Sequence, residues 1–128
     1  MKALVVDDSK AMRRIVGGIL KKQGFEICEA ADGKEAFDLL TDPETGPVTL
    51  ACIDWNMPVM NGLELVVAIR GRRDLRNISL MMVTTETEHS QIVRALAAGA
   101  HEYLIKPFTP DGLKEKLILL GLNPEGTS

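Results

Sequence analysis

The chain has no apolar run long enough to cross a membrane and too few cysteines for a disulfide framework. A membrane span needs about 20 consecutive apolar residues, and the first apolar run, 3–6, meets acidic residues before a signal-peptide core could form. We therefore expect a cytoplasmic protein that does not enter a membrane. The two cysteines among the 128 residues both lie in apolar runs, where a free thiol usually serves as a small buried side chain.

A large excess of charge of one sign is also missing. The net charge is −3, with 26% charged residues, which argues against wholesale binding of nucleic acid. The one basic cluster, over residues 70–76, is interrupted by Asp74 and contains no aromatic ring to stack on bases, so we interpret it as a solvated loop. The composition, 45% hydrophobic, predicts one globular domain over residues 1–122. We expect residues 123–128, which are polar and rich in turn formers, to be a flexible C-terminal tail.

Short apolar runs alternate with helical patterns along the whole chain, which predicts five βα units. The strands are expected at 3–6, 25–30, 48–53, 78–83 and 102–105, each covered on both faces because the runs are unbroken. Capping residues predict helices at 10–23, 33–40, from 61 onward, at 90–98 and from 109 onward. Right-handed crossovers then predict an α/β fold: a doubly wound, flavodoxin-like parallel sheet of five strands in the order 2-1-3-4-5.

Charged and hydroxyl side chains stand where the predicted strands end. Asp7 and Asp8 follow the first strand, Asp54 the third and Lys106 the fifth, while Thr84 follows the fourth. Because the carboxyl ends of parallel strands share one edge of the sheet, we expect these side chains to converge. Clustered carboxylates without a histidine or thiol favour Mg²⁺. A carboxylate can also attack phosphorus, so we predict Asp54 as a phosphoacceptor whose phosphoryl oxygens contact Lys106 and Thr84.

Seven short segments give the chain a resemblance to a known family. They are VVDDS (5–9), MRRIV (12–16), DWNMP (54–58), GLEL (62–65), MVT (82–84), AGA (98–100) and KPFT (106–109). Together they resemble the receiver domains of two-component response regulators and, within that family, the single-domain chemotaxis regulators of the CheY type. The resemblance implies that a sensor histidine kinase phosphorylates Asp54. It also implies that Mg²⁺ is held by Asp8, Asp54 and the backbone carbonyl of Asn56, with Asp7 acting partly through water.

The same resemblance implies a switch and a set of partners. The switch runs from Thr84 through Tyr103 to the face formed by the fourth helix, fifth strand and fifth helix. Asn56 and Glu86 match the positions that tune the rate of dephosphorylation, and Lys106-Pro107 is often a cis peptide in the family. The implied partners are the kinase, a downstream protein target such as a flagellar motor switch, and a phosphatase. The implied protein is a monomeric signalling module, not a metabolic enzyme, and binds no nucleic acid or membrane.

The chain departs from the chemotaxis regulators next to the switch threonine. Thr85 stands where they usually have a small residue, and Thr87-Glu88-His89 replaces a segment with adjacent lysines in motor-binding members. A bulky residue at 85 could hinder access of water or a partner to the phosphoryl group. A stand-alone receiver in a phosphorelay unrelated to motility therefore stays open.

Two further classes of protein fit the sequence less well. A phosphohydrolase with an aspartyl nucleophile usually carries a second acid two residues later, where this chain has Ser9 after Asp7 and Asn56 after Asp54. A flavin or nucleotide binder on the same fold needs a phosphate cradle rich in glycine or hydroxyls after the first strand. Asp7 and Asp8 at that place would repel such a ligand.

Overall fold

Five parallel strands and five helices alternate along the chain. The structure is a computed structural model that describes residues 1–85 and 89–122. The strands are β1 (Lys2–Val6), β2 (Glu26–Ala30), β3 (Leu50–Ile53), β4 (Ser79–Thr84) and β5 (Glu102–Ile105). The helices are α1 (Lys10–Lys22), α2 (Gly33–Thr41), α3 (Gly62–Arg70), α4 (His89–Ala98) and α5 (Pro110–Leu119), with short 3-10 turns η1 (Pro43–Thr45) and η2 (Arg73–Leu75).

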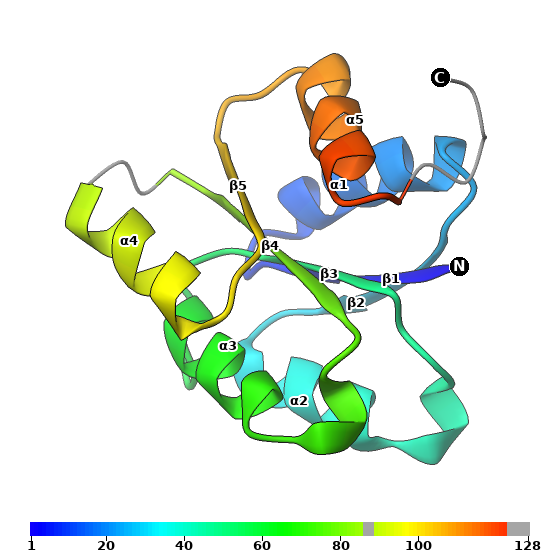
Figure 1. The fold of residues 1–128 in the computed structure, drawn as a ribbon. Coiled ribbons are helices and arrows are strands. Elements are labelled where there is room, and N and C mark those ends of the chain that lie inside the picture. The colour runs from blue at the N-terminus through cyan, green and yellow to red at the C-terminus, as the bar shows by residue number, and fades with distance from the viewer. Residues whose placement is uncertain (86–88, 123–128) are drawn as a thin grey trace.

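The sheet has the order β2-β1-β3-β4-β5, and every neighbouring pair is parallel. This is the predicted order, so the doubly wound, flavodoxin-like fold is confirmed. Figure 1 shows α1 and α5 on one face of the sheet and α2, α3 and α4 on the other. The chain reverses its direction of winding after β2, which leaves β1 and β3 side by side at the centre.

Each face of the sheet has its own hydrophobic core. On the α1 and α5 side, the pairs Val16/Leu20 and Leu113/Leu117, each four residues apart on one helical face, pack against the sheet. On the other side, α3 contributes Leu65, Val66 and Ile69, all 0% exposed. Burying one such side chain stabilises the fold by roughly 1.5–3 kcal/mol. These two layers fix the helices and so the loops at the ends of the strands.

The edge strands differ from the prediction that all five strands are covered on both faces. The central strand β3 is buried at every residue, and β1 and β4 at all but their first residue. In contrast, β2 is buried only at Ala30 and β5 only at Leu104. An edge strand has one neighbour, and the helices that pack on the sheet leave its outer side in contact with solvent. The prediction is therefore correct for the centre and wrong for the edges.

Side-chain caps fix where the helices begin, as the sequence predicts. The hydroxyl of Ser9 accepts from Met12 N at 3.2 Å, and Asp32 Oδ1 accepts from Glu35 N at 2.8 Å. Asn61 and Glu64 cap α3 reciprocally, with distances of 2.8 and 3.0 Å. At the start of α5, the Thr109 hydroxyl accepts from Gly112 N at 3.0 Å, and a proline stands in the first turn.

Packing explains one of the two glycines in α1. A Cβ at Gly17 would lie 3.3 Å from Ile27 Cγ2, so packing against β2 favours glycine there. A Cβ at Gly18 would meet nothing within 4 Å, and nothing in the structure explains this glycine. Cys28 and Cys52 are free thiols on strands separated by β1, as expected. Complete burial raises the pKa of the Cys52 thiol to about 12.

Some predictions fall on parts of the chain that are not described. Residues 123–128, expected to form the tail, and Glu86 and Glu88 beside the switch threonine lie outside the described residues. Within 1–85 and 89–122, no helix is both long and apolar enough to span a membrane.

Candidate phosphoryl and metal site

The ends of β1, β3, β4 and β5 bring the predicted site residues to one edge of the sheet. Asp54 N donates to Val6 O at 2.9 Å, and Lys106 N donates to Thr84 O at 2.9 Å, so the strand pairing continues into the site. Asp7, Asp54 and Thr84 are 4%, 7% and 0% exposed. Asp8, in contrast, is exposed. Asp7, Asp54 and Thr84 therefore form the buried part of the site, and Asp8 is its solvent-exposed carboxylate.

The three carboxylates are close enough to share one cation. One oxygen from each of Asp7, Asp8 and Asp54 lies within 4.8 Å of the other two. Lys106 Nζ donates to Asp7 Oδ2 at 2.6 Å and lies 3.7 Å from Asp54 Oδ2. Its ammonium group thus compensates part of the negative charge from the side of β5. The predicted convergence of these four residues is confirmed in the structure.

Burial and a neighbouring charge together disfavour ionised Asp54. Burial raises the pKa of Asp54, and the nearby carboxylate of Asp7 raises it further. The ammonium of Lys106 opposes this rise in the pKa, as do hydrogen bonds from the Thr84 hydroxyl and the Trp55 backbone. The net direction is upward. An added cation would relieve this cost without protonating the nucleophile.

The donor set suits a hard divalent cation. All three side-chain donors are carboxylate oxygens, and Asp8 is open to solvent. Asp7 Oδ2 accepts from Lys106 and Oδ1 from Ser9 N, and each carboxylate oxygen has a second lone pair that can bind a cation. Mg²⁺ commonly takes one or two carboxylates and keeps several waters, which matches a site with one exposed side. The residues present therefore fit the ion. The backbone carbonyl of Asn56, two residues after Asp54 in an exposed loop, stays a predicted ligand.

The loop from β3 to α3 is packed closely beneath the site. A Cβ at Gly62 would lie 2.3 Å from Asp54 O, so only glycine allows α3 to begin so near the phosphoacceptor. A Cβ at Gly33 would lie 2.6 Å from Met60 O, and Gly33 N donates to that carbonyl at 3.1 Å. The same loop holds Val59 at a φ of 67°, which is unusual for a β-branched residue. Asp54 therefore sits on a loop clamped between α2 and α3.

The predicted switch residues are only partly brought together. Thr84 is buried beside Asp54, whereas Tyr103 is half-buried on β5 and packs against the core under α2, α3 and α4. The bond Lys106-Pro107 is cis, as the resemblance implies. Thr85 is exposed and, with Met12 and Phe108, lines a pocket of about 440 Å³ beside Lys106.

The contacts of Arg13, Arg70 and His101 were not predicted from the sequence. Arg13 binds the backbone carbonyl of Asp7, and Arg70 binds three backbone carbonyls and His101, so Arg70 is not part of a solvated loop. His101 is exposed, and its Nδ1 accepts a hydrogen bond from Leu80 N on β4 at 3.2 Å. Every residue has a backbone carbonyl, so the sequence does not show which carbonyl an arginine will bind. The contacts of Arg13 and Arg70 could therefore not be predicted.

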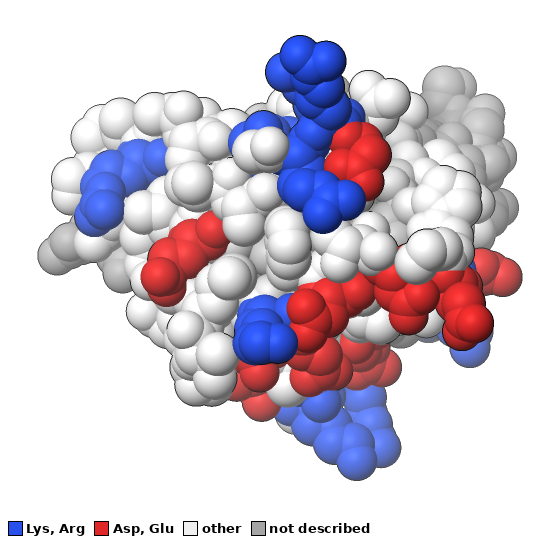
Figure 2. All heavy atoms as spheres, turned by 90° about the horizontal axis from the view of Figure 1, so that it is seen from below, with Lys and Arg blue, Asp and Glu red and all other residues white. Residues whose placement is uncertain are grey.

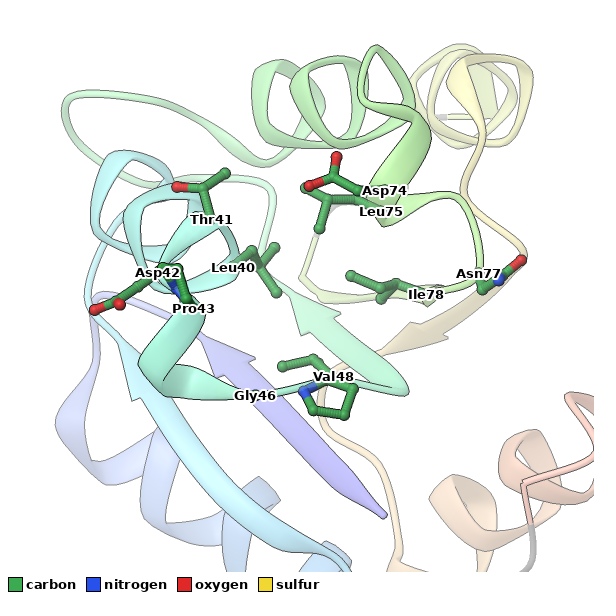
Figure 3. Close-up of a pocket in the computed structure, with 11 residues that line it drawn as sticks. Leu40, Thr41, Asp42, Pro43, Gly46, Val48, Asp74, Leu75, Asn77 and Ile78 are labelled. Atoms are coloured by element: carbon green, nitrogen blue, oxygen red, sulfur yellow. The ribbon is translucent and has the colours of Figure 1, made fainter.

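Two other surface features lie away from the acidic site. Figure 2 shows a band of acidic side chains on the face that lies lowest in Figure 1. The exposed acidic residues of α2, η1 and the position between them are Glu35, Asp38, Asp42 and Glu44. Figure 3 shows a pocket of about 500 Å³ between α2, η1 and the start of β4, with Leu40, Val48, Leu75 and Ile78 among its lining residues. It lies near the amino ends of β3 and β4, at the opposite end of the sheet from Asp54.

The sheet order, the acidic cluster and the lysine beside it define the receiver class of signalling domain. The chain belongs to this class: residues 3–118 match the family described as response regulator receiver domain. Members of the class act as regulators in signalling rather than as metabolic enzymes.

Named relatives cover nearly the whole chain. A chemotaxis protein CheY homolog of Campylobacter jejuni is 49% identical over 118 residues, which cover 91% of this chain and 89% of that protein. Chemotaxis protein CheY1 of Helicobacter pylori is 46% identical over 125 residues, covering 96% and 99%. The structure of chemotaxis protein CheY4 of Vibrio cholerae superposes with a TM-score of 0.83 at 36% identity and covers 92% of this chain and 96% of that one.

Proposed function

We propose that the chain is a phosphorylation-dependent switch in which Asp54 accepts a phosphoryl group from a sensor histidine kinase. The observation that carries the proposal is the clustering of Asp54 with the carboxylates of Asp7 and Asp8, the ammonium of Lys106 and the hydroxyl of Thr84. Phosphoryl transfer needs mainly positioning and charge stabilisation, which these side chains supply.

The chemistry follows from the charges around Asp54. A carboxylate oxygen of Asp54 forms the new bond to phosphorus, while the bond from phosphorus to the donor imidazole nitrogen breaks and the imidazole leaves with the electron pair. Bound Mg²⁺ would offset the charge of the acids and of the phosphoryl oxygens. Lys106, now bonded to Asp7 and 3.7 Å from Asp54 Oδ2, would turn toward a phosphoryl oxygen, and the Thr84 hydroxyl, which now donates to Asp54, would donate to another.

The switch is proposed to change the face formed by α4, β5 and α5. A phosphoryl group that draws the Thr84 hydroxyl away from its present position frees space next to β5, on which Tyr103 is half-buried. A shift of Tyr103 then changes the population of two states of this face. On α4, the apolar side chains of Val93 and Leu96 are 49% and 43% exposed, and they supply a surface for a protein target.

The named relatives suggest chemotaxis as the setting. We propose a cytoplasmic, monomeric regulator whose partners are a histidine kinase, a flagellar motor switch protein and a phosphatase that removes the phosphoryl group. Asn56 and Glu86 are the proposed residues that tune the phosphoryl lifetime. The chain catalyses only its own phosphotransfer and autodephosphorylation.

Phosphorylation by a small donor tests the proposal without knowledge of the kinase. In Mg²⁺ and acetyl phosphate, we expect the intact mass to rise by one phosphoryl group and the fluorescence of Trp55, the only tryptophan, to change. Asp54→Asn should abolish both changes, and EDTA should abolish them in the unmodified protein. Equal phosphorylation of Asp54→Asn would refute the assignment.

The output partner needs a separate experiment. Protein activated with beryllofluoride is expected to bind a flagellar motor switch peptide more tightly than unactivated protein does. The matched control is Asp54→Asn treated in the same way. Activation with no gain in binding of this peptide would refute the motor assignment and favour a phosphorelay unrelated to motility.

A further inference from the structure

Arg13 on α1 is tied to the acidic site through the backbone, not through a carboxylate of the site. Its Nη1 donates to the backbone carbonyl of Asp7 at 2.7 Å, and its Nε donates to Glu29 Oε1 at 3.0 Å. The Arg13 side chain is 16% exposed, whereas that of Glu29 on β2 is 44% exposed. One guanidinium thus joins α1, the loop after β1 and the edge strand.

The bonded carbonyl belongs to the peptide that links Asp7 to Asp8. The Asp7 side chain is already fixed, because Oδ1 accepts from Ser9 N at 2.9 Å and Oδ2 accepts from Lys106. The Asp8 carboxylate is exposed and has no hydrogen bond or ion pair within the described parts of the chain. Orientation of the 7–8 peptide is therefore the main constraint on where the Asp8 carboxylate points.

We propose that Arg13 is a positioning residue for the cation site: by holding the Asp7 carbonyl, it keeps the Asp8 carboxylate near those of Asp7 and Asp54. Glu29 has a supporting part, since it holds the guanidinium from the opposite side. Arginine suits this task because its planar fork binds two acceptors in fixed directions, whereas a lysine ammonium acts as a point charge. The proposal rests on the proposed function, because it presumes that the carboxylates bind Mg²⁺.

Electrostatics alone makes the opposite prediction, which gives the test its strength. A guanidinium near a divalent cation repels it, so loss of the positive charge would by itself tighten Mg²⁺ binding. Loss of a group that orients a metal ligand commonly weakens metal affinity by about 10- to 100-fold. The sign of the change in Mg²⁺ affinity therefore separates a positioning role from a charge effect.

The experiment is a Mg²⁺ titration of Trp55 fluorescence, repeated by calorimetry without phosphodonor. Arg13→Ala is expected to weaken Mg²⁺ binding by roughly tenfold. The matched control is Arg14→Ala, which removes the same charge from the next position of α1, where the side chain is exposed. This variant should bind Mg²⁺ as tightly as the unmodified protein or slightly more tightly. Glu29→Gln should show a smaller loss than Arg13→Ala.

Arg13→Lys keeps the charge and guards against a variant that fails to fold. A lysine at position 13 can reach one of the two acceptors but not both. The Mg²⁺ affinity of Arg13→Lys should therefore fall between those of Arg13→Ala and the unmodified protein. Circular dichroism checks that Arg13→Ala is folded. If the folded Arg13→Ala variant binds Mg²⁺ as tightly as Arg14→Ala or more tightly, the inference is overturned. Failure of the unmodified protein to bind Mg²⁺ would instead refute the proposed function.

Discussion

At the scale of single residues, Asp54 combines two demands that oppose each other. A nucleophile must be ionised, yet burial and the neighbouring Asp7 raise the pKa of Asp54. The pKa of Asp54 is higher in the folded protein than in the unfolded chain. Stability therefore falls as the pH rises from the pKa of the unfolded chain through the pKa of the folded protein. This cost disappears as the pH falls below the unfolded value.

Asp54→Asn should therefore make the fold more stable at pH 7.5 in the absence of metal. The amide removes one negative charge from the cluster, and we expect a gain on the order of 1 kcal/mol in the free energy of unfolding. Urea denaturation in EDTA at pH 7.5 and 4.5 measures the gain, which should shrink at the lower pH. Lower stability of the variant at pH 7.5 would contradict this account of the charge balance.

At the scale of elements, the loop from β3 to α3 stores backbone strain. Val59 has a φ of 67° and is 77% exposed, and Met60 N donates to Pro58 O at 2.7 Å, which closes a tight turn around it. A left-handed conformation costs a residue with a Cβ roughly 1–2 kcal/mol, and glycine avoids most of that cost. The clamp from Gly33 and Gly62 holds the turn in place.

Val59→Gly is expected to stabilise the protein, which is rare for a substitution by glycine. The strain that is relieved exceeds the entropy that glycine loses on folding, and little buried surface is removed, so we predict a net gain of roughly 0.5–1 kcal/mol. Urea denaturation measures it. Val67→Gly, at an exposed position inside α3, is the control and should lower the stability. Equal losses in both variants would rule out strain at Val59.

A second element-scale feature joins α3 to the turn between α4 and β5. Arg70, the last residue of α3, donates to Gly99 O at 3.0 Å and Ile78 O at 3.1 Å, and its Nη2 lies 3.2 Å from His101 Nδ1. Gly99 has a φ of 126°, and a Cβ there would lie 2.6 Å from Arg70 Cγ. His101 Nδ1 accepts hydrogen bonds and so carries no proton in this arrangement.

His101 should make the fold less stable as the pH falls. Burial and the guanidinium of Arg70 lower the pKa of His101 from its ordinary value of 6.5. Below pH 6.5 the unfolded chain binds a proton that the folded protein binds less readily, so stability falls as the pH drops toward the folded pKa. Urea denaturation at pH 7.5 and 5.5 should show a smaller loss in His101→Gln than in the unmodified protein.

The control for this pH effect is His89→Gln, which removes the other histidine of the chain at the exposed start of α4. The comparison of the two variants isolates the contribution of His101 because all carboxylates are common to both. An identical loss of stability on acidification in His101→Gln and the unmodified protein would show that the contact with Arg70 does not depend on the protonation of His101.

The elements were largely predictable because their signals are local. Caps such as Ser9 and Asn61 lie at the helix starts, and apolar runs mark the strands, so the alternation and the order of the sheet followed. The exposure of β2 and β5 was not predicted, because unbroken apolar runs were interpreted as cover on both faces although the predicted order put both strands at the edges of the sheet. Contacts with backbone carbonyls, made by Arg13 and Arg70, were equally hidden.

At the scale of the whole molecule, the site exists because of the strand order. Asp7 and Asp54 are 47 positions apart, and Lys106 is 99 positions from Asp7. They meet because β1 and β3 are neighbours at the centre of a sheet whose strands all end at the same edge. The convergence was predictable once the strand order was assumed, whereas strand order alone does not determine that Lys106 lies closer to Asp7 than to Asp54.

The central claim is that Asp54, and neither Asp7 nor Asp8, accepts the phosphoryl group. The most direct measurement is to phosphorylate the protein with acetyl phosphate and Mg²⁺, reduce the acyl phosphate with borohydride, and identify the altered residue by peptide mass spectrometry. Reduction converts a phosphorylated aspartate into homoserine, and we predict homoserine at position 54 alone. Homoserine at position 7 or 8 would contradict the account. Homoserine at no position, with acetyl phosphate and Mg²⁺ both present, would contradict it as well.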